Sequence, residues 1–356
     1  MGLAGSPAFD DARVIVPLSD GRLIAYDLFN GDEVWTIKRD SLPTPVAADG
    51  HVFLARDTSL VALDAESGGA VWESALDTPL AAPITADQGW TLLGGATGVI
   101  TALRTSDGSR VWSRDVASPP AHSVSMSPAH VYASLRDGRV VALNIADGTI
   151  AWERRLGGTP QPVLALDDRL YVGSDDNYFY CLLASNGRVD WRWQTGGDIV
   201  GLSAFDDRRV YFVSKDNVIR ALDRRSGAQR WWKPMRLRAT HGPIAVGDAV
   251  LVSGFGPAVQ AFLMRDGAAA GDFNAGGLLA APPHVITSSK SPVPLVVYVT
   301  RSLNAAGPTI TGAGRNVEPA ISPLVPLPNP VPVTPLPGSE PPPSEADSPA
   351  AEPRLR

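Results

Sequence analysis

One three-residue pattern recurs seven times along this chain of 356 residues. In each copy a small residue is followed six positions later by a glycine, and six copies carry a tryptophan ten positions after the small residue. The copies are Ala25/Gly31/Trp35, Ala62/Gly68/Trp72, Ala102/Gly108/Trp112, Ala142/Gly148/Trp152, Cys181/Gly187/Trp191, Ala221/Gly227/Trp231 and Ala261/Gly267, the last with Gly271 at the tryptophan position. They stand about forty residues apart, which is the length of one four-stranded propeller blade. The repeat therefore predicts an all-β propeller.

Each repeat contains several short segments with the sequence pattern of a β-strand. Short apolar runs bounded by turn residues, such as residues 51–54 and 209–212, are typical of strands. The residue before each repeat glycine is Asn, Ser or Asp, and such pairs supply the positive φ of a tight hairpin. We therefore expect the third strand of each blade to turn directly into a fourth strand that carries the tryptophan. The small residue opposite leaves room for the indole, whose N–H needs an acceptor such as a neighbouring backbone carbonyl.

First strands align at eight places, one more than the repeat glycines. They are Pro7-Ala8, Pro45-Val46, Pro83-Ile84, Ser123-Val124, Pro162-Val163, Gly201-Leu202, Pro243-Ile244 and His284-Val285. The eighth unit keeps a second strand at residues 295–299 but lacks the turn glycine and the tryptophan. We expect an eight-bladed β-propeller of four-stranded antiparallel blades, with seven blades and an appended strand pair as the alternative.

The propeller is predicted to span residues 1–311, followed by a Pro-rich, extended or disordered C-terminal tail over residues 312–356. Proline recurs densely from Pro319 to Pro343. Because proline lacks a backbone N–H and favours the extended polyproline II conformation, we expect no propeller strand from Gly312 onward.

Composition narrows the classes of function. The net charge of −6, with both signs mixed, disfavours binding to nucleic acid, and no apolar run is long enough for a transmembrane span. The single cysteine, Cys181, excludes an internal disulfide and a multi-cysteine metal site. It occupies an alanine position of the repeat, so we expect a small buried residue there.

The segments 60–72 and 219–231 carry the pattern in full, and they resemble the tryptophan-docking repeat of quinoprotein-type (PQQ-like) propellers. The resemblance covers residues from about Ser6 to Val299. That family includes pyrroloquinoline-quinone (PQQ) dehydrogenases of alcohols and sugars. It also includes cofactor-free members, such as the propeller lipoprotein of the outer-membrane barrel-assembly machinery. Resemblance to the enzymes would imply a calcium ion held by Glu and Asn, a catalytic Asp, and often a disulfide between adjacent cysteines. No such set is recognisable here, so the resemblance favours the cofactor-free members.

The candidate ligand site is the axial funnel, where the first strands converge. At or just before the aligned first strands lie Thr44, His122, Ser123, Gln161, His241 and His284. Histidines from separate blades can hold a metal ion or an anion, and the alternative is that these polar residues line a wet channel. The basic pairs Arg224/Arg225 and Arg236/Arg238 are interpreted as solvated faces rather than phosphate sites.

These observations favour a non-catalytic propeller that acts as a protein-interaction scaffold, expected to be monomeric and without a cofactor. The repeat tryptophans Trp35, Trp72, Trp112, Trp152, Trp191 and Trp231 are assigned a structural role, and no catalytic, cofactor-binding or metal-binding residue is assigned. The resemblance implies the cell envelope or periplasm and outer-membrane protein assembly. The alternative is a small PQQ-dependent alcohol or sugar dehydrogenase with PQQ and calcium. Residues 1–6 lack the features of a secretory signal, so the chain is interpreted as either cytoplasmic or truncated at its N-terminus.

Overall fold

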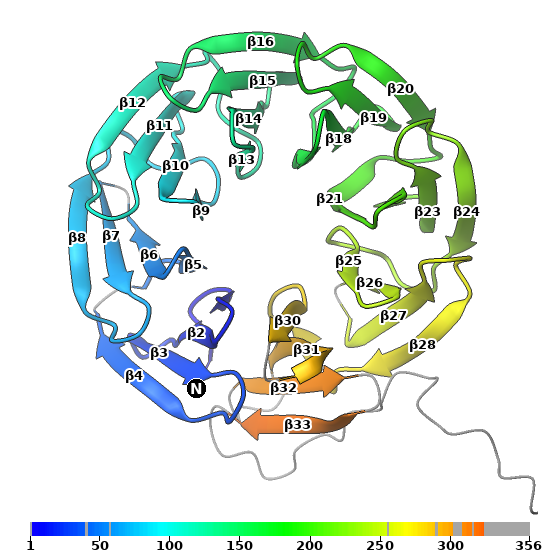
Figure 1. Ribbon diagram of the computed structural model, residues 1–356. Helices are drawn as coiled ribbons and strands as arrows, with labels where there is room; N and C mark the ends of the chain where they lie inside the picture. The colour runs from blue at the N-terminus through cyan, green and yellow to red at the C-terminus, as the bar shows by residue number, and fades with distance from the viewer. Residues whose placement is uncertain are drawn as a thin grey trace, which may run out of the picture.

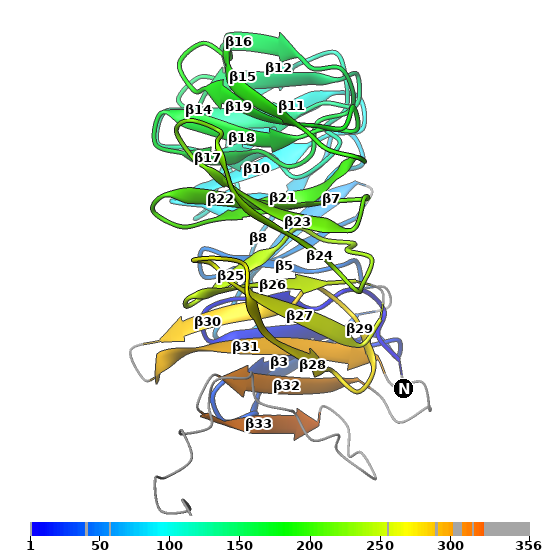
Figure 2. The same cartoon turned by 90° about the vertical axis from the view of Figure 1, so that its right-hand side faces the viewer.

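The chain forms a ring of β-sheets around a central axis, which Figure 1 shows along the axis and Figure 2 from the edge. The computed structural model describes residues 2–39, 42–56, 58–254, 256–288, 291–301, 308–314 and 317–323. Within these residues there are eight sheets, each built from consecutive antiparallel strands. The predicted eight-bladed propeller is confirmed, and the seven-bladed alternative is wrong.

Each blade contributes one strand to the innermost position of the ring. The inner strands are β1 (Ala8–Phe9), β5 (Val46–Ala48), β9 (Thr85–Asp87), β13 (Ser125–Met126), β17 (Leu164–Leu166), β21 (Ile199–Phe205), β25 (Ile244–Val246) and β30 (His284–Ser288). Blade 8 has an additional short strand, β29 (Leu278–Leu279), which pairs with the same second strand as β30. The second strands are β2 (Arg13–Pro17), β6 (His51–Ala55), β10 (Trp90–Gly94), β14 (His130–Ser134), β18 (Arg169–Gly173), β22 (Arg209–Ser214), β26 (Ala249–Ser253) and β31 (Ser291–Arg301).

The remaining two strands of each blade lie toward the circumference (Figure 1). The third strands are β3 (Arg22–Asp27), β7 (Ser59–Asp64), β11 (Val99–Arg104), β15 (Arg139–Asn144), β19 (Tyr178–Leu183), β23 (Val218–Asp223), β27 (Ala258–Leu263) and β32 (Thr309–Gly314). The outer strands are β4 (Glu33–Lys38), β8 (Ala70–Ala75), β12 (Arg110–Asp115), β16 (Ile150–Arg155), β20 (Val189–Gln194), β24 (Gln229–Pro234), β28 (Ala269–Asn274) and β33 (Val317–Pro323).

The apolar core is divided among the interfaces between blades. Every large cluster of buried apolar residues combines two neighbouring blades, as where Tyr132 and Val140 of blade 4 pack with Leu170 of blade 5. The ring closes in the same way, because Val14 of blade 1 packs with Val297 of blade 8. Each blade is a continuous stretch of chain, so closure depends on side-chain packing between the first and last blades.

The repeat tryptophans join each blade to the next. Trp35 stands opposite Ala25 in its own blade, and its indole N–H donates to the carbonyl of Ala65 in blade 2 at 2.9 Å. The ring covers Gly68, where an added Cβ would lie only 2.7 Å from the indole. The same docking pairs Trp72, Trp112, Trp152, Trp191 and Trp231 with the carbonyls of Thr105, Ile145, Ala184, Arg224 and Met264. Each indole N–H thus has a backbone carbonyl as its acceptor, as predicted, and the acceptor belongs to the neighbouring blade.

The propeller extends past the boundary predicted at residue 311. β32 and β33 complete blade 8, so the prediction that no strand forms from Gly312 onward is wrong as far as Pro323. Pro319 lies where the pairing of β33 with β32 shifts register, between Val317 and Ala320, and Pro323 is the last residue of β33. On an outermost strand one side needs no donor, and prolines are tolerated there. The predicted tail beyond Pro323 lies outside the described residues.

Candidate functional site

Five of the six predicted funnel residues lie in one kind of segment. The first fully paired residue of an inner strand stands opposite a buried second-strand residue, as where Ser125 pairs with Tyr132 and Leu164 with Tyr171. We call the three residues before it the inner bulge, which covers residues 43–45 in blade 2, 122–124 in blade 4, 161–163 in blade 5, 201–203 in blade 6 and 241–243 in blade 7. Thr44, His122, Ser123, Gln161 and His241 belong to these bulges, at the same end of the inner strands.

The inner bulges of blades 4 to 7 place equivalent positions side by side. His122, Gln161 and His241 each stand three residues before the first paired residue of their inner strand, and Gly201 stands three residues before Ala204, where the pairing of β21 resumes after a bulge. The Gln161 side chain accepts a hydrogen bond from the Gly201 backbone N–H at 3.2 Å, which ties blade 5 to blade 6. A Cβ on Gly201 would lie 3.1 Å from the carbonyl carbon of His241, so blade 6 and blade 7 also touch here. We call this arc the funnel rim.

Asp175 joins the funnel rim from the turn between β18 and β19. Its carboxylate accepts a hydrogen bond from the Gln161 side-chain amide at 3.1 Å. Burial lowers the pKa of His122, and the negative charge of Asp175 opposes that shift. Burial also lowers the pKa of His241, whose Nδ1 lies 3.0 Å from the Thr240 hydroxyl. Both histidines are therefore neutral hydrogen-bonding groups at pH 7 rather than fixed cations.

The six predicted funnel residues do not all lie together at one site. His284 lies inside its inner strand, paired with Val297, and stacks on Phe9 of blade 1 with 4.8 Å between ring centroids. Burial lowers its pKa against the charges of Asp11 and Asp10, which belong to the turn at the opposite end of the strands. Thr44 is exposed in blade 2, beside Gly5. Among the described residues, no group of three or more His, Cys, Asp or Glu is placed to hold a metal ion.

Leu202 is a functional candidate that sequence reasoning missed. It lies in the inner bulge of blade 6, at the position that Ser123 occupies in blade 4, and 45% of it is exposed. Its neighbours along the funnel rim, Gln161 and His241, are polar and half-buried. A large exposed apolar side chain with a polar surround is typical of an anchor for a protein partner. The aligned first strands gave no signal for it, because they placed Leu202 opposite Val124, one residue from its position in the structure, where the other blades also carry apolar residues.

The family model described as outer membrane protein assembly factor BamB matches residues 19–163 and 136–272. The outer membrane protein assembly factor BamB of Yersinia pestis is 27% identical over 110 residues. That match covers 30% of this chain and 28% of the relative, so most of the relative's length is not aligned. The described part of the chain contains no helix long and apolar enough to span a membrane.

Solved structures share the architecture. BamB from Moraxella catarrhalis superposes with a TM-score of 0.61 at 18% identity, over 82% of this chain and 85% of that one. The quinohemoprotein alcohol dehydrogenase of Comamonas testosteroni superposes with a TM-score of 0.65 at 14% identity, over 84% of this chain and 72% of the enzyme. At these identities the likeness establishes the fold, which catalytic and non-catalytic proteins share.

Proposed function

Because the chain belongs to the PQQ-like propeller family described as outer membrane protein assembly factor BamB, we propose that it is a non-catalytic scaffold that binds a protein partner in the cell envelope, in outer-membrane protein assembly. The observation that carries the proposal is the exposed Leu202 on the funnel rim. The family membership supports a role in outer-membrane protein assembly, and the funnel rim is the surface that we propose contacts the partner.

The funnel rim has the properties of a binding surface with an apolar centre. Full burial of a leucine side chain contributes about 1.5–3 kcal/mol, and Leu202 still has 45% of its surface to bury. Gln161 is held by Gly201 and Asp175, so the polar surround is already ordered before a partner arrives. Ordered surroundings lower the entropic cost of association.

Site-specific photo-crosslinking in the native host tests this proposal. A photoreactive amino acid at position 202 is expected to give a discrete protein adduct in the envelope fraction. The same amino acid at Val71, which is 46% exposed on the outer strand β8, is the control and should give none. Leu202→Asp should abolish co-purification of the adduct partner, whereas Val71→Asp should not, and both variants should melt at the wild-type temperature. Equal adducts at both positions, or none at 202, would refute the proposed surface.

The alternative of a quinone-dependent dehydrogenase makes a different prediction for the same purified protein. Dye reduction with alcohols or sugars, after incubation with PQQ and calcium, would contradict the scaffold proposal. A heat-treated sample gives the background rate.

A further inference from the structure

Blade 6 departs from the repeat at the position that receives the docking tryptophan. The carbonyls that accept the indole N–H belong to Ala65, Thr105, Ile145, Ala184, Arg224 and Met264. Arg224 is the charged member of this series, and only 15% of its side chain is exposed. The interpretation of Arg224 as part of a solvated face is therefore wrong, although its neighbour Arg225 is exposed.

The backbone of Arg224 is held on both sides. Its N–H donates to the carbonyl of Arg208 at 2.9 Å. Its carbonyl accepts the Tyr171 hydroxyl at 2.8 Å and the Trp191 indole N–H at 3.3 Å. The two bonds to the carbonyl join blades 5 and 6. The backbone from which the Arg224 side chain extends is therefore fixed.

The Arg224 guanidinium spans the two blades. One terminal nitrogen pairs with the Asp167 carboxylate of blade 5 at 2.8 Å, and the other donates to the Asp206 carbonyl of blade 6 at 3.2 Å. Nε is buried and has no hydrogen-bond partner in the described part of the chain. A buried donor without a partner is costly, and it is commonly satisfied by a ligand or a water molecule.

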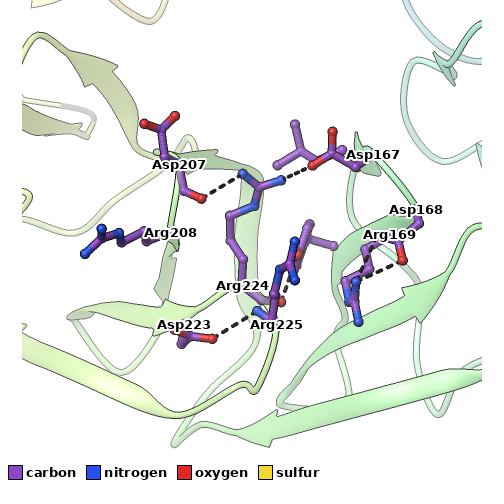
Figure 3. Close-up of a pocket in the computed structure, with 10 residues that line it drawn as sticks. Asp167, Asp168, Arg169, Asp207, Arg208, Asp223, Arg224 and Arg225 are labelled. Carbon is purple, nitrogen blue, oxygen red and sulfur yellow. Dashed lines mark hydrogen bonds and ion pairs between the residues drawn. The ribbon is translucent and has the colours of Figure 1, made fainter.

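A cleft of about 250 Å³ opens above Arg224, between the turns of blades 5 and 6 (Figure 3). Arg208 and Arg225 line it, both exposed, and their guanidinium groups make no hydrogen bond or ion pair to any described residue. Three of the lining carboxylates are already engaged. Asp167 pairs with Arg224, Asp168 pairs with Arg169 at 2.8 Å, and Asp223 pairs with Arg230 at 2.6 Å. The cleft thus offers two free guanidinium forks.

We propose that this cleft binds the carboxylate groups of an acidic peptide segment of a partner protein. A guanidinium fork matches a carboxylate with two parallel hydrogen bonds, and two forks can hold successive acidic side chains. The lining charges without an ion-pair partner among the described residues are the two guanidinium groups and one carboxylate, Asp207, so positive charge is in excess among them. The Asp207 carboxylate can accept a backbone N–H of a bound peptide.

The site is separate from the funnel rim. The cleft is formed by the turns that follow β17, β21 and β23, whereas the inner bulges lie before the last paired residues of the inner strands, so the two surfaces lie at opposite ends of the strands. The proposal therefore does not rest on the proposed function. The two proposals can fail independently. Crosslinking at position 202 tests the funnel rim, and it is expected to be unchanged when the arginines of the cleft are replaced.

The test uses the full chain and a fluorescein-labelled oligoglutamate peptide at low ionic strength, with anisotropy as the readout. The variant R208A/R225A removes both free forks, and it should fold because the repeat carries alanine at these positions in Ala12 and Ala146. The control R110A/R265A removes the same charge from exposed arginines, and Arg265 holds the position of Arg225 in blade 7. We expect at least about ten-fold weaker binding for R208A/R225A and no more than about two-fold for the control.

Two results would overturn the proposal. One is equal affinity of the peptide for wild type and R208A/R225A. The other is tighter binding of inorganic phosphate or an oligonucleotide than of oligoglutamate, measured by competition. An oligoglutamine peptide of the same length should not compete, which separates carboxylate recognition from contact with any extended chain.

Discussion

Replacing Gly68 by alanine should destabilise the propeller through two separable effects. Gly68 has a φ of +70°, and a Cβ there would lie 2.7 Å from Cδ2 and 2.9 Å from Cε3 of Trp35. The left-handed conformation costs a non-glycine residue about 1–2 kcal/mol. Forcing a methyl group into a packed interface costs about 1–3 kcal/mol more. We therefore expect G68A to lower the free energy of unfolding by about 2–5 kcal/mol.

Gly50 provides a matched control within the same blade. Its φ is +73°, but nothing lies within 4 Å of the Cβ that alanine would add. G50A should therefore cost only the conformational part, about 1–2 kcal/mol. The difference between the two variants measures the contact with the indole alone.

Urea-induced unfolding of G68A, G50A, W35A and the double variant W35A/G68A measures these effects. Removing the indole removes the clash, so G68A should cost only about 1–2 kcal/mol in the W35A background. If G68A and G50A shift the unfolding midpoint equally, the docking of Trp35 on Gly68 contributes no tight contact and the reasoning fails. Additive costs in the double variant would lead to the same conclusion.

Two further predictions concern titratable groups. Burial raises the pKa of Cys181 to about 12, so iodoacetamide at pH 8 should alkylate it slowly in the folded protein and quickly in urea; equal rates would contradict its burial. Burial lowers the pKa of His122 and His241 below the ordinary histidine value of 6.5. The unfolded chain therefore binds more protons than the folded protein as the pH falls below 6.5, and stability decreases. H122Q/H241Q, which places the residue of Gln161 in both blades, should lose less stability than wild type between pH 7 and pH 5. If the urea midpoint falls by the same amount in H122Q/H241Q and in wild type between pH 7 and pH 5, other titratable groups cause the pH dependence.

The repeat made most of the fold predictable. A fixed spacing of glycine and tryptophan locates one hairpin in every blade, and Trp35 docks where the pattern requires. The C-terminal boundary of the propeller was predicted too early in the sequence, because prolines lack a backbone N–H and were taken to exclude a strand. Pro319 and Pro323 lie on an outermost strand, where that group needs no partner.

The site was partly predictable for the same reason. Alignment to the repeat found His122, Gln161 and His241, because equivalent positions in a propeller lie in equivalent places. It misplaced His284, because blade 8 keeps too little of the pattern to fix the register of β30. The burial of Arg224 could not be predicted, since the groups that enclose it come from blade 5 and from a different turn of blade 6.

The docking of Trp191 on blade 6 differs from the other five tryptophan contacts. The Arg224 carbonyl receives two donors, the Tyr171 hydroxyl and the Trp191 indole, whereas the other docking carbonyls receive the indole at 2.7–2.9 Å. The Trp191 bond is the longest of the six, at 3.3 Å. A longer hydrogen bond is a weaker one, so the docking bond between blades 5 and 6 is the weakest of the six. Leu202 and the arginine cleft lie at opposite ends of blade 6, so they flank the docking interface that has the longest of the six indole bonds.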